Sequence, residues 1–239
     1  MVNRYKIADV VFDAEYTYAY TAHVLRNYLS TDGAPSEFSI KITDADLEIE
    51  NQKADGEFEK PYLESLAVYR KLLAVLLDKK AIVFHCSAVA VDGKAYLFTA
   101  PSGTGKSTHV RLWKELFGNR AVVVNDDKPI IRLIDGQLFV YGTPWNGKHE
   151  LDTNVKVKVK AICKLERGEK NRIFEIDKSK MISTMLGQTL RPDKVEDLDK
   201  LLGIVAEILQ NTALYRLECN KDISSAQLSF DVMSQGGAK

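Results

Sequence analysis

Apolar and polar positions alternate along the chain in patterns that predict both strands and helices. In the first eighty residues, 6–12 and 37–42 are β-rich runs, and 19–29 carries apolar residues at helical spacing between them. The polar stretch 48–60 indicates a loop or a sheet edge. Residues 62–80 repeat apolar side chains at i, i+3 and i+7, which predicts an amphipathic helix ending in two lysines.

The second part of the chain is richer in continuous apolar runs. Residues 81–91 and 94–100 are joined by Asp92-Gly93, a pair that favours a two-residue hairpin turn. Strands joined in this way are antiparallel, so a simple βαβ alternation is excluded. Further strands are expected at 121–124, 137–141 and 214–218, with 160–165 and 172–176 as a pair around Arg167-Gly168. Helices are expected at 107–117, 178–190, 195–210 and 224–233.

These patterns predict an α/β fold with a mixed central sheet and flanking helices. Residues 1–80 form a small N-terminal α+β subdomain in this prediction, and residues 81–239 form the larger domain. No Gly- or Pro-rich linker separates the two segments, so we expect the subdomain to pack on the larger domain.

Composition narrows the class of protein. Hydrophobic residues make up 45% of the chain and charged residues 28%, values typical of a globular protein. Lys and Arg together number 33, as do Asp and Glu, and this balance disfavours general nucleic-acid binding. Apolar runs fall far short of the ~20 residues that a membrane span needs. Cys86, Cys163 and Cys219 lack metal-ligand spacing, so we expect reduced thiols in a cytoplasmic protein without a signal peptide.

The strongest chemical signal follows the predicted strand at 94–100. Residues 101–108 read Pro-Ser-Gly-Thr-Gly-Lys-Ser-Thr and precede a predicted helix, which is the order of a phosphate-binding loop with Ala100 in the first glycine position. The two glycines let successive N–H groups face a phosphate, and the helix N-terminus adds partial positive charge. The expected nucleotide-binding residues are Ser102, Gly103, Thr104, Gly105, Lys106, Ser107 and Thr108.

Two of these side chains have a more specific expected role. Lys106 would neutralise the β- and γ-phosphates of ATP, and the Ser107 hydroxyl would bind Mg²⁺. Asp126 and Asp127 end the next apolar strand, where carboxylates are costly unless a cation faces them. One of them would bind the metal, and the other could act as a general base toward an attacking hydroxyl. An ordinary surface turn is the alternative for this pair.

His85 lies in the run that pairs with the strand of the phosphate-binding loop. It could contact a transferring phosphate, although a structural role is the alternative. Residues 142–148 read Gly-Thr-Pro-Trp-Asn-Gly-Lys, which indicates either a rigid turn or a loop that clamps a ligand. Lys128 and Lys148 are candidates for a third phosphate contact, with a solvated lysine as the alternative.

With these features in this order, the chain resembles the HPr kinase/phosphorylase family, whose nucleotide-binding core is related to phosphoenolpyruvate carboxykinase. The resemblance covers about residues 81–239. It implies that His85 contacts phosphate, that Lys106 and Ser107 bind the nucleotide and its metal, and that Asp126 accepts a serine proton. Asp127 would lie on the metal side, with ATP and Mg²⁺ as cofactors.

The chain looks closer still to a group of bacterial HPr-kinase-like proteins. They share the segments found here at 100–109, 125–129 and 142–148, and they occur among genes for modified peptides. The resemblance implies a serine-bearing peptide, protein or small molecule as acceptor, and it leaves a homo-oligomer open. Two features depart from the family: the Gly- and Arg-rich segment that serves HPr binding and phosphorolysis has no counterpart, and residues 1–80 differ from the family's N-terminal domain.

The expected function is an ATP- and Mg²⁺-dependent kinase in which Asp126, His85 and Lys106 are the catalytic residues. A non-catalytic nucleotide sensor that docks a partner remains an alternative, with residues 1–80 as its docking surface. Carboxykinase chemistry on an organic acid is a second alternative, for which Arg132 or Arg191 could bind the acid.

Overall fold

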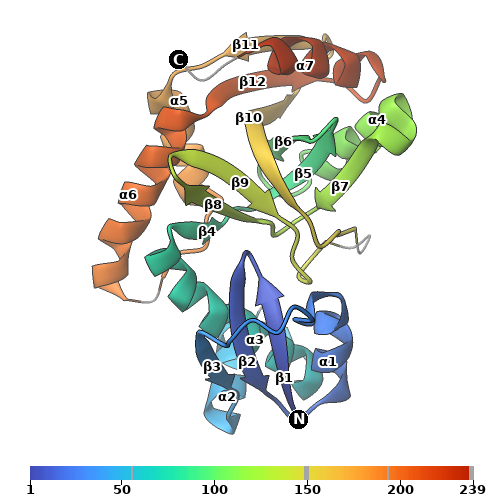
Figure 1. Cartoon of the computed structure of the whole chain (residues 1–239). Helices are drawn as coiled ribbons and strands as arrows, with labels where there is room; N and C mark the ends of the chain where they lie inside the picture. The colour runs from blue at the N-terminus through green and yellow to red at the C-terminus, as the bar shows by residue number, and fades with distance from the viewer. Residues whose placement is uncertain (55, 148–150, 193, 237–239) are drawn as a thin grey trace. The chain divides into compact units, whose positions relative to one another are not determined.

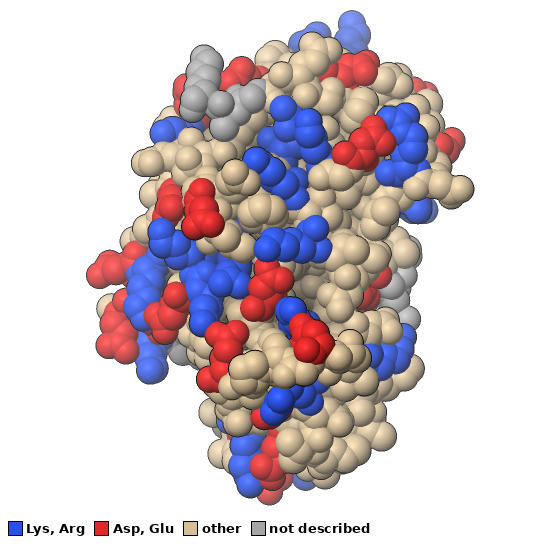
Figure 2. Space-filling view, in the orientation of Figure 1, with Lys and Arg blue, Asp and Glu red and all other residues tan. Residues whose placement is uncertain are grey.

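The computed structural model describes residues 1–54, 56–147, 151–192 and 194–236 (Figure 1). The chain divides into two compact units, Met1–Leu76 and Leu77–Lys239. Within the described residues, no helix is long and apolar enough to cross a bilayer. On the face drawn in Figure 2, Lys and Arg side chains lie among Asp and Glu side chains, in keeping with the equal numbers of the two charges.

The first unit contains a small three-stranded sheet and three helices. Its strands are β1 (Val2–Ile7), β2 (Val10–Glu15) and β3 (Phe38–Lys41), with β2 antiparallel to β1 and parallel to β3. The prediction of one strand over residues 6–12 is wrong, because Ala8 and Asp9 adopt positive φ angles of 54° and 60° and reverse the chain. Ala-Asp is not a usual hairpin pair, so the apolar run gave no sign of the turn.

The helices of this unit correct a second expectation. They are α1 (Ala19–Leu25), followed by the 3-10 turn η1 (Arg26–Tyr28), then α2 (Asp44–Lys53) and α3 (Lys60–Leu76). Residues 48–60, expected as a loop or edge, supply more than half of α2, whose ten residues end at Lys53. The signal for this helix was a capping box, in which the Thr43 side chain bonds the Asp46 N–H and the Asp46 carboxylate bonds the Thr43 N–H.

The second unit is built on a mixed sheet that curls through nine strands. The path β4-β8-β9-β10-β6-β5-β7 is extended by β12, which pairs with β10, and by β11, which pairs with β12. The strands are β4 (Ala81–Val83), β5 (Cys86–Val91), β6 (Lys94–Thr99), β7 (Ala121–Asn125), β8 (Ile130–Ile134), β9 (Gln137–Tyr141), β10 (Lys156–Arg167), β11 (Arg172–Glu175) and β12 (Ala213–Cys219). The α/β class with a mixed sheet is therefore as predicted.

The β5–β6 hairpin confirms the Asp92-Gly93 turn. Both residues have positive φ, 51° and 75°, and the strands on either side pair antiparallel. The run 81–91, however, is two strands. β4 pairs with β8, whereas β5 pairs with β6 and β7, so the chain changes its place in the sheet at Phe84 and His85. His85 is consequently half-exposed rather than buried within a strand.

The expected pairing of 160–165 with 172–176 is wrong. β12 lies between β10 and β11, parallel to β10 and antiparallel to β11. A short loop near Arg167-Gly168 suggested a hairpin, but strand β12, which begins at Ala213, far beyond the end of β10 at Arg167, occupies the edge of β10 instead. Because a parallel neighbour arrives from a distant part of the chain, local sequence does not reveal it.

Helices cover both faces of this sheet. They are α4 (Lys106–Phe117) and α7 (Ser224–Gln235) on one face, and α5 (Lys178–Gly187) and α6 (Val195–Asn211) on the other, with the 3-10 turns η2 (Leu77–Lys79) and η3 (Gly118–Arg120) (Figure 1). Each pair of helices packs on its own apolar cluster. One cluster centres on Trp113 and Phe98, and the other on Ile208 and Met185, so the unit has three layers.

One edge of the sheet receives the ends of several strands. β6, β7, β10 and β12 run in the same direction, because β7 and β6 are both antiparallel to β5 and because β10 is parallel to β6 and β12. Their carboxyl ends therefore lie along one edge, in the order β7, β6, β10, β12. β5 begins at that edge, directly after His85. Segments far apart in sequence meet there, and ligands of open α/β sheets bind at such edges.

Candidate active site

Residues 101–108 form a tight loop between β6 and α4. Gly103 and Gly105 have φ angles of 76° and 124°, a backbone region that strains any residue with a side chain. Gly105 is the N-cap of α4 and offers no side-chain cap, so the free N–H groups of the first turn are available to an anion. Ser102 lies exposed on the loop, and Thr104, Ser107 and Thr108 are half-buried along it.

The Lys106 side chain folds back beneath this loop. Its Nζ donates a hydrogen bond of 2.9 Å to the Ala100 carbonyl, and the residue is only 7% exposed. Burial lowers the pKa of Lys106, while the negative charge of Asp127 opposes that effect. A phosphate in the loop would offer the ammonium a stronger partner than a neutral carbonyl, since hydrogen bonds between ions are roughly twice as strong.

Asn125 shapes the turn that carries the two aspartates. Its Oδ1 accepts hydrogen bonds from the N–H groups of Asp127 (2.8 Å) and Lys128 (2.7 Å). Its Nδ2 donates to the carbonyls of Thr143 (3.0 Å) and Trp145 (3.3 Å). The side chain is fully buried, and every polar atom on it has a partner. Asn125 thus ties the aspartate turn to the segment 142–147.

Asp127 lies between the side chains of His85 and Lys128. Its Oδ1 is 3.1 Å from the Nε2 of His85, and its Oδ2 is 3.2 Å from the Nζ of Lys128. The hydrogen bond from His85 is the main reason that the pKa of Asp127 falls to about 2; burial opposes this effect, and Lys128 adds to it. The carboxylate is therefore ionised at neutral pH, near the Lys106 ammonium that it influences.

This environment predicts a pH-dependent contribution to stability. The Asp127 pKa of about 2 lies below the ~3.9 of an unfolded aspartate. The charged form is thus favoured in the folded state, and the resulting stability is present above about pH 4 and lost as the pH falls toward 2. Asp127→Asn should lower the free energy of unfolding by roughly 2 kcal/mol at pH 7.

Urea unfolding at pH 7 and pH 3 measures this difference. The gap between wild type and Asp127→Asn should narrow at the lower pH. Asp92→Asn is a matched control, because Asp92 pairs with Arg120 at a fully exposed position where ion pairs contribute little. A gap that stays constant across the pH range would contradict the assignment of the stability to the Asp127 charge.

Asp126 has a different environment from Asp127. It is 3% exposed, and its Oδ1 accepts a hydrogen bond of 2.7 Å from the Gly147 N–H. A Cβ on Gly147 would lie 3.0 Å from the Asp126 carboxylate, and one on Gly142 would collide with the Thr153 carbonyl. Gly147 therefore lets the segment 142–147 pack closely over Asp126, and Gly142 lets the start of the segment approach the Thr153 backbone.

The structure bears on both readings of this segment. Trp145 is 6% exposed, so its ring is buried rather than displayed to a ligand. The Thr143 hydroxyl donates a hydrogen bond of 2.8 Å to the Lys128 carbonyl, which fixes the segment further. These contacts fit a rigid turn. Lys148, the other candidate phosphate contact, lies outside the described residues.

Known proteins give little help in assigning a function. No protein-family model matches the chain, and no curated protein matches it. One structural match is to the Hpr(Ser) kinase/phosphatase from Coxiella burnetii. That match covers 64% of this chain and 91% of the other, with 13% sequence identity and a TM-score of 0.35. The function is therefore inferred from the residues of the site.

Arg167 also reaches the loop, although no functional role was predicted for it. Its Nη2 donates a hydrogen bond of 2.6 Å to the Gly103 carbonyl, and its Nε lies 3.5 Å from the Thr104 carbonyl. The guanidinium comes from the end of β10, beside the end of β6. It holds the carbonyl side of the loop, so the N–H groups are left to face a ligand.

The oxygen donors near the loop fit Mg²⁺, a hard cation that is usually bound by one or two protein groups together with phosphates. Ser107 supplies a hydroxyl in the first turn of α4, and Asp127 supplies an ionised carboxylate. In the described part of the chain, no group of three or more His, Cys, Asp or Glu side chains forms a metal site. A cage made wholly of protein ligands is not what a nucleotide-bound Mg²⁺ requires.

Proposed function

We propose that this protein is an ATP- and Mg²⁺-dependent phosphotransferase that transfers the γ-phosphoryl group to a hydroxyl, with serine as the preferred acceptor. The observation that carries the proposal is the convergence at one sheet edge of the loop 101–108, the Lys106 ammonium and the Asp127–His85 pair. A phosphate-binding loop alone would fit many nucleotide-binding proteins. Phosphoryl transfer to a hydroxyl also needs a base and a metal ligand, and the neighbouring carboxylates of Asp126 and Asp127 can supply both.

Each of these residues has one role in the proposed phosphoryl transfer. The acceptor oxygen forms a bond to the γ-phosphorus as the bond from that phosphorus to the β,γ-bridging oxygen breaks, and ADP leaves. The acceptor proton passes to the Asp126 carboxylate. Lys106, the N–H groups of the loop and His85 stabilise negative charge on the transferred group. Mg²⁺, when bound by Ser107 and Asp127, would neutralise phosphate charge.

The position of Asp126 also supports a second candidate, a nucleotide-binding module without catalysis. Its carboxylate is buried and bonded to the Gly147 N–H, so an acceptor hydroxyl would have to reach it past the segment 142–147. In a binding module that contact would persist, and occupancy of the loop would be signalled to a partner.

A transfer assay separates these candidates. The full-length protein is incubated with ATP and Mg²⁺ and with either a pool of serine-containing peptides, free serine or oxaloacetate. Mass spectrometry then detects the gain of one phosphoryl group by a serine-bearing acceptor, or, with oxaloacetate, phosphoenolpyruvate formed by gain of a phosphoryl group and loss of CO₂. Product from a serine-bearing acceptor supports the kinase, and product from oxaloacetate supports carboxykinase chemistry. ATP binding without transfer to any acceptor favours the binding module.

A further inference from the structure

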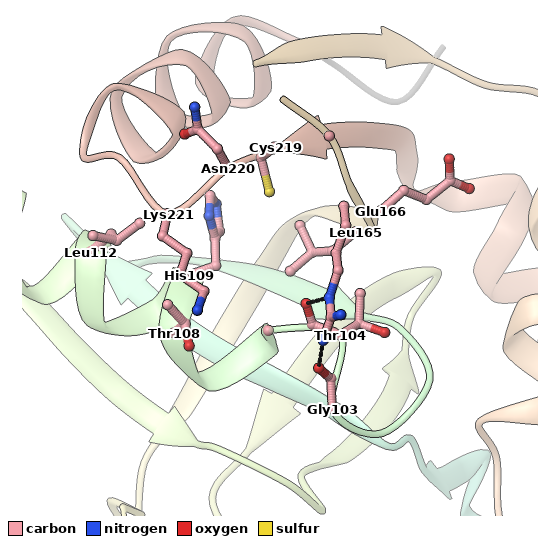
Figure 3. Close-up of a pocket in the computed structure, with 13 residues that line it drawn as sticks. Gly103, Thr104, Thr108, His109, Leu112, Leu165, Glu166, Cys219, Asn220 and Lys221 are labelled. Atoms are coloured by element: carbon pink, nitrogen blue, oxygen red, sulfur yellow. Dashed lines mark hydrogen bonds between the residues drawn. The ribbon is translucent and has the colours of Figure 1, made fainter. Parts of the chain in front are cut away.

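A pocket lies beside the phosphate-binding loop, on the side away from the aspartates. It has a volume of about 450 Å³. Its walls include Thr108, His109 and Leu112 on α4, Leu165 on β10, and Cys219 and Lys221 at the end of β12 (Figure 3). Small-molecule binding pockets in proteins typically have volumes of ~300–1,000 Å³, so this pocket has room for a nucleoside.

The pocket combines apolar and polar surface. Leu112 and Leu165 supply apolar surface. Glu166 and Asn220 border the pocket but turn away from it (Figure 3). Glu166 pairs with Lys164 at 2.8 Å, and the Asn220 amide donates to the Glu169 carbonyl at 3.1 Å. Their polar atoms are therefore already used, which leaves the recognition of a ligand to other residues.

His109 is the first of these residues. It is 3% exposed, and burial lowers its pKa to about 4, so the ring is neutral at pH 7. Its Nε2 lies 3.1 Å from the Ser229 hydroxyl. The same Nε2 accepts a hydrogen bond of 3.2 Å from the Trp113 N–H, a donor that it shares with the Ser229 hydroxyl. Among the described residues, its Nδ1 has no hydrogen-bond partner. In either tautomer, Nδ1 can therefore form one bond with a ligand, and burying it without one is costly.

Lys221 is the second. Its side chain extends toward Thr108 in the first turn of α4 (Figure 3). An ammonium at the N-terminal end of a helix adds to the positive potential there, so the arrangement favours an anion at the junction of loop and pocket. A phosphate at this junction would lie between the loop and a group bound against Leu112.

The order of the strands places the pocket and the aspartates on opposite sides of β6. β5 and β7, which carry His85 and the aspartates, lie on one side of β6. β10 and β12, which carry Arg167 and Lys221, lie on the other. A chain of phosphates in the loop can therefore extend from the pocket to the Asp127–His85 pair.

We propose that this pocket binds the nucleoside of a nucleoside triphosphate, with the base between Leu112 and Leu165, a hydrogen bond to His109 and the α-phosphate near Lys221. The terminal phosphoryl group then faces Asp127. This inference rests on the proposed function, because it requires phosphates in the loop 101–108.

Cys219 provides a direct probe of the pocket. It is half-buried in the pocket wall, whereas Cys86 and Cys163 are fully buried. Burial raises the pKa of the Cys219 thiol, so alkylation is followed at mildly alkaline pH. The rate is measured with Mg²⁺ alone, with ATP and Mg²⁺, and with inorganic tripolyphosphate and Mg²⁺. Thermal unfolding under the same conditions reports binding in the loop.

We expect both ligands to raise the melting temperature and only ATP to slow alkylation of Cys219, by about ten-fold. If both stabilise the protein and neither protects Cys219, the pocket proposal is overturned while the phosphate site stands. Equal protection by tripolyphosphate also overturns it, because no nucleoside would be needed. If neither ligand stabilises the protein, the proposed function fails, and the pocket proposal falls with it.

A pair of leucine variants tests the pocket independently. Leu112 and Leu116 both pack on the same apolar cluster from successive turns of α4, but only Leu112 is among the pocket residues. Leu112→Gln should weaken ATP binding about ten-fold and leave tripolyphosphate binding unchanged. Leu116→Gln should leave both unchanged, which separates loss of the pocket from loss of helix packing. Equal ATP affinities in the two variants would contradict the proposal.

Discussion

Replacing Lys106 by Ala should remove most of the stabilisation of this protein by ATP and Mg²⁺. At about 100 times its dissociation constant, a ligand stabilises the wild type by ~2.7 kcal/mol. Loss of a buried ammonium that pairs with phosphate costs roughly 2–4 kcal/mol, or about 30- to 1,000-fold in affinity. At the same ATP concentration, a 100-fold loss leaves only ~0.4 kcal/mol of stabilisation. Thermal unfolding of each variant with and without ATP measures the change.

Lys114→Ala is the matched control for this experiment. Lys114 lies on the same helix, and its Nζ also donates to a backbone carbonyl, that of Ala121, at 3.1 Å. It differs from Lys106 in lying at the exposed end of α4, away from the loop. The control should keep the full ATP-dependent rise. An undiminished rise in Lys106→Ala would remove the phosphate site from residues 101–108.

Asp126→Asn should separate binding from catalysis. The amide oxygen can still accept the Gly147 hydrogen bond, so the segment 142–147 keeps its contact and ATP binding changes little. The amide cannot take the acceptor proton, so phosphoryl transfer should fall by about 10²- to 10⁴-fold. Rates of transfer to the acceptor found by mass spectrometry, together with ATP affinity, measure the two effects.

Asp127→Asn completes this comparison. If Asp127 serves the metal, its replacement should raise the Mg²⁺ concentration needed for half-maximal transfer, an effect absent from Asp126→Asn. Unchanged transfer in Asp126→Asn would exclude it as the base. A loss of transfer confined to Asp127→Asn, at saturating Mg²⁺, would assign the proton to Asp127 instead.

Local signals in the sequence predicted the parts of the fold that depend on neighbouring residues. Asp92-Gly93 predicted the hairpin because the turn requires positive φ at both positions, and the amphipathic pattern predicted α6 almost to its ends. The break at His85 could not be predicted in this way. Its cause is that β4 pairs with β8, which comes later in the chain, so the information lies outside the apolar run.

The candidate site likewise contains residues that are contiguous in sequence and residues that only the fold brings together. The residues of the loop 101–108 are contiguous in sequence, and Gly103 and Gly105 have positive φ angles in the structure. No contact between His85 and Asp127 was predicted, because the sequence associated one with phosphate and the other with metal; in the structure His85 Nε2 lies 3.1 Å from Asp127 Oδ1. Arg167, His109 and Lys221 were missed, since an arginine, a helical histidine and a surface lysine have no local signature. They meet only because β10 and β12 end at the same edge as β6.

The buried amide of Asn125 has a consequence for how this sequence can vary. One face of that amide organises the Asn-Asp-Asp turn, and the other holds the backbone of Thr143 and Trp145. Two segments that look like separate motifs are thus one unit, which the Thr143–Lys128 and Gly147–Asp126 hydrogen bonds also join. In a related protein that lacks one of these segments, the other would lose its hydrogen-bond partners. We therefore expect the two segments to be present together or absent together.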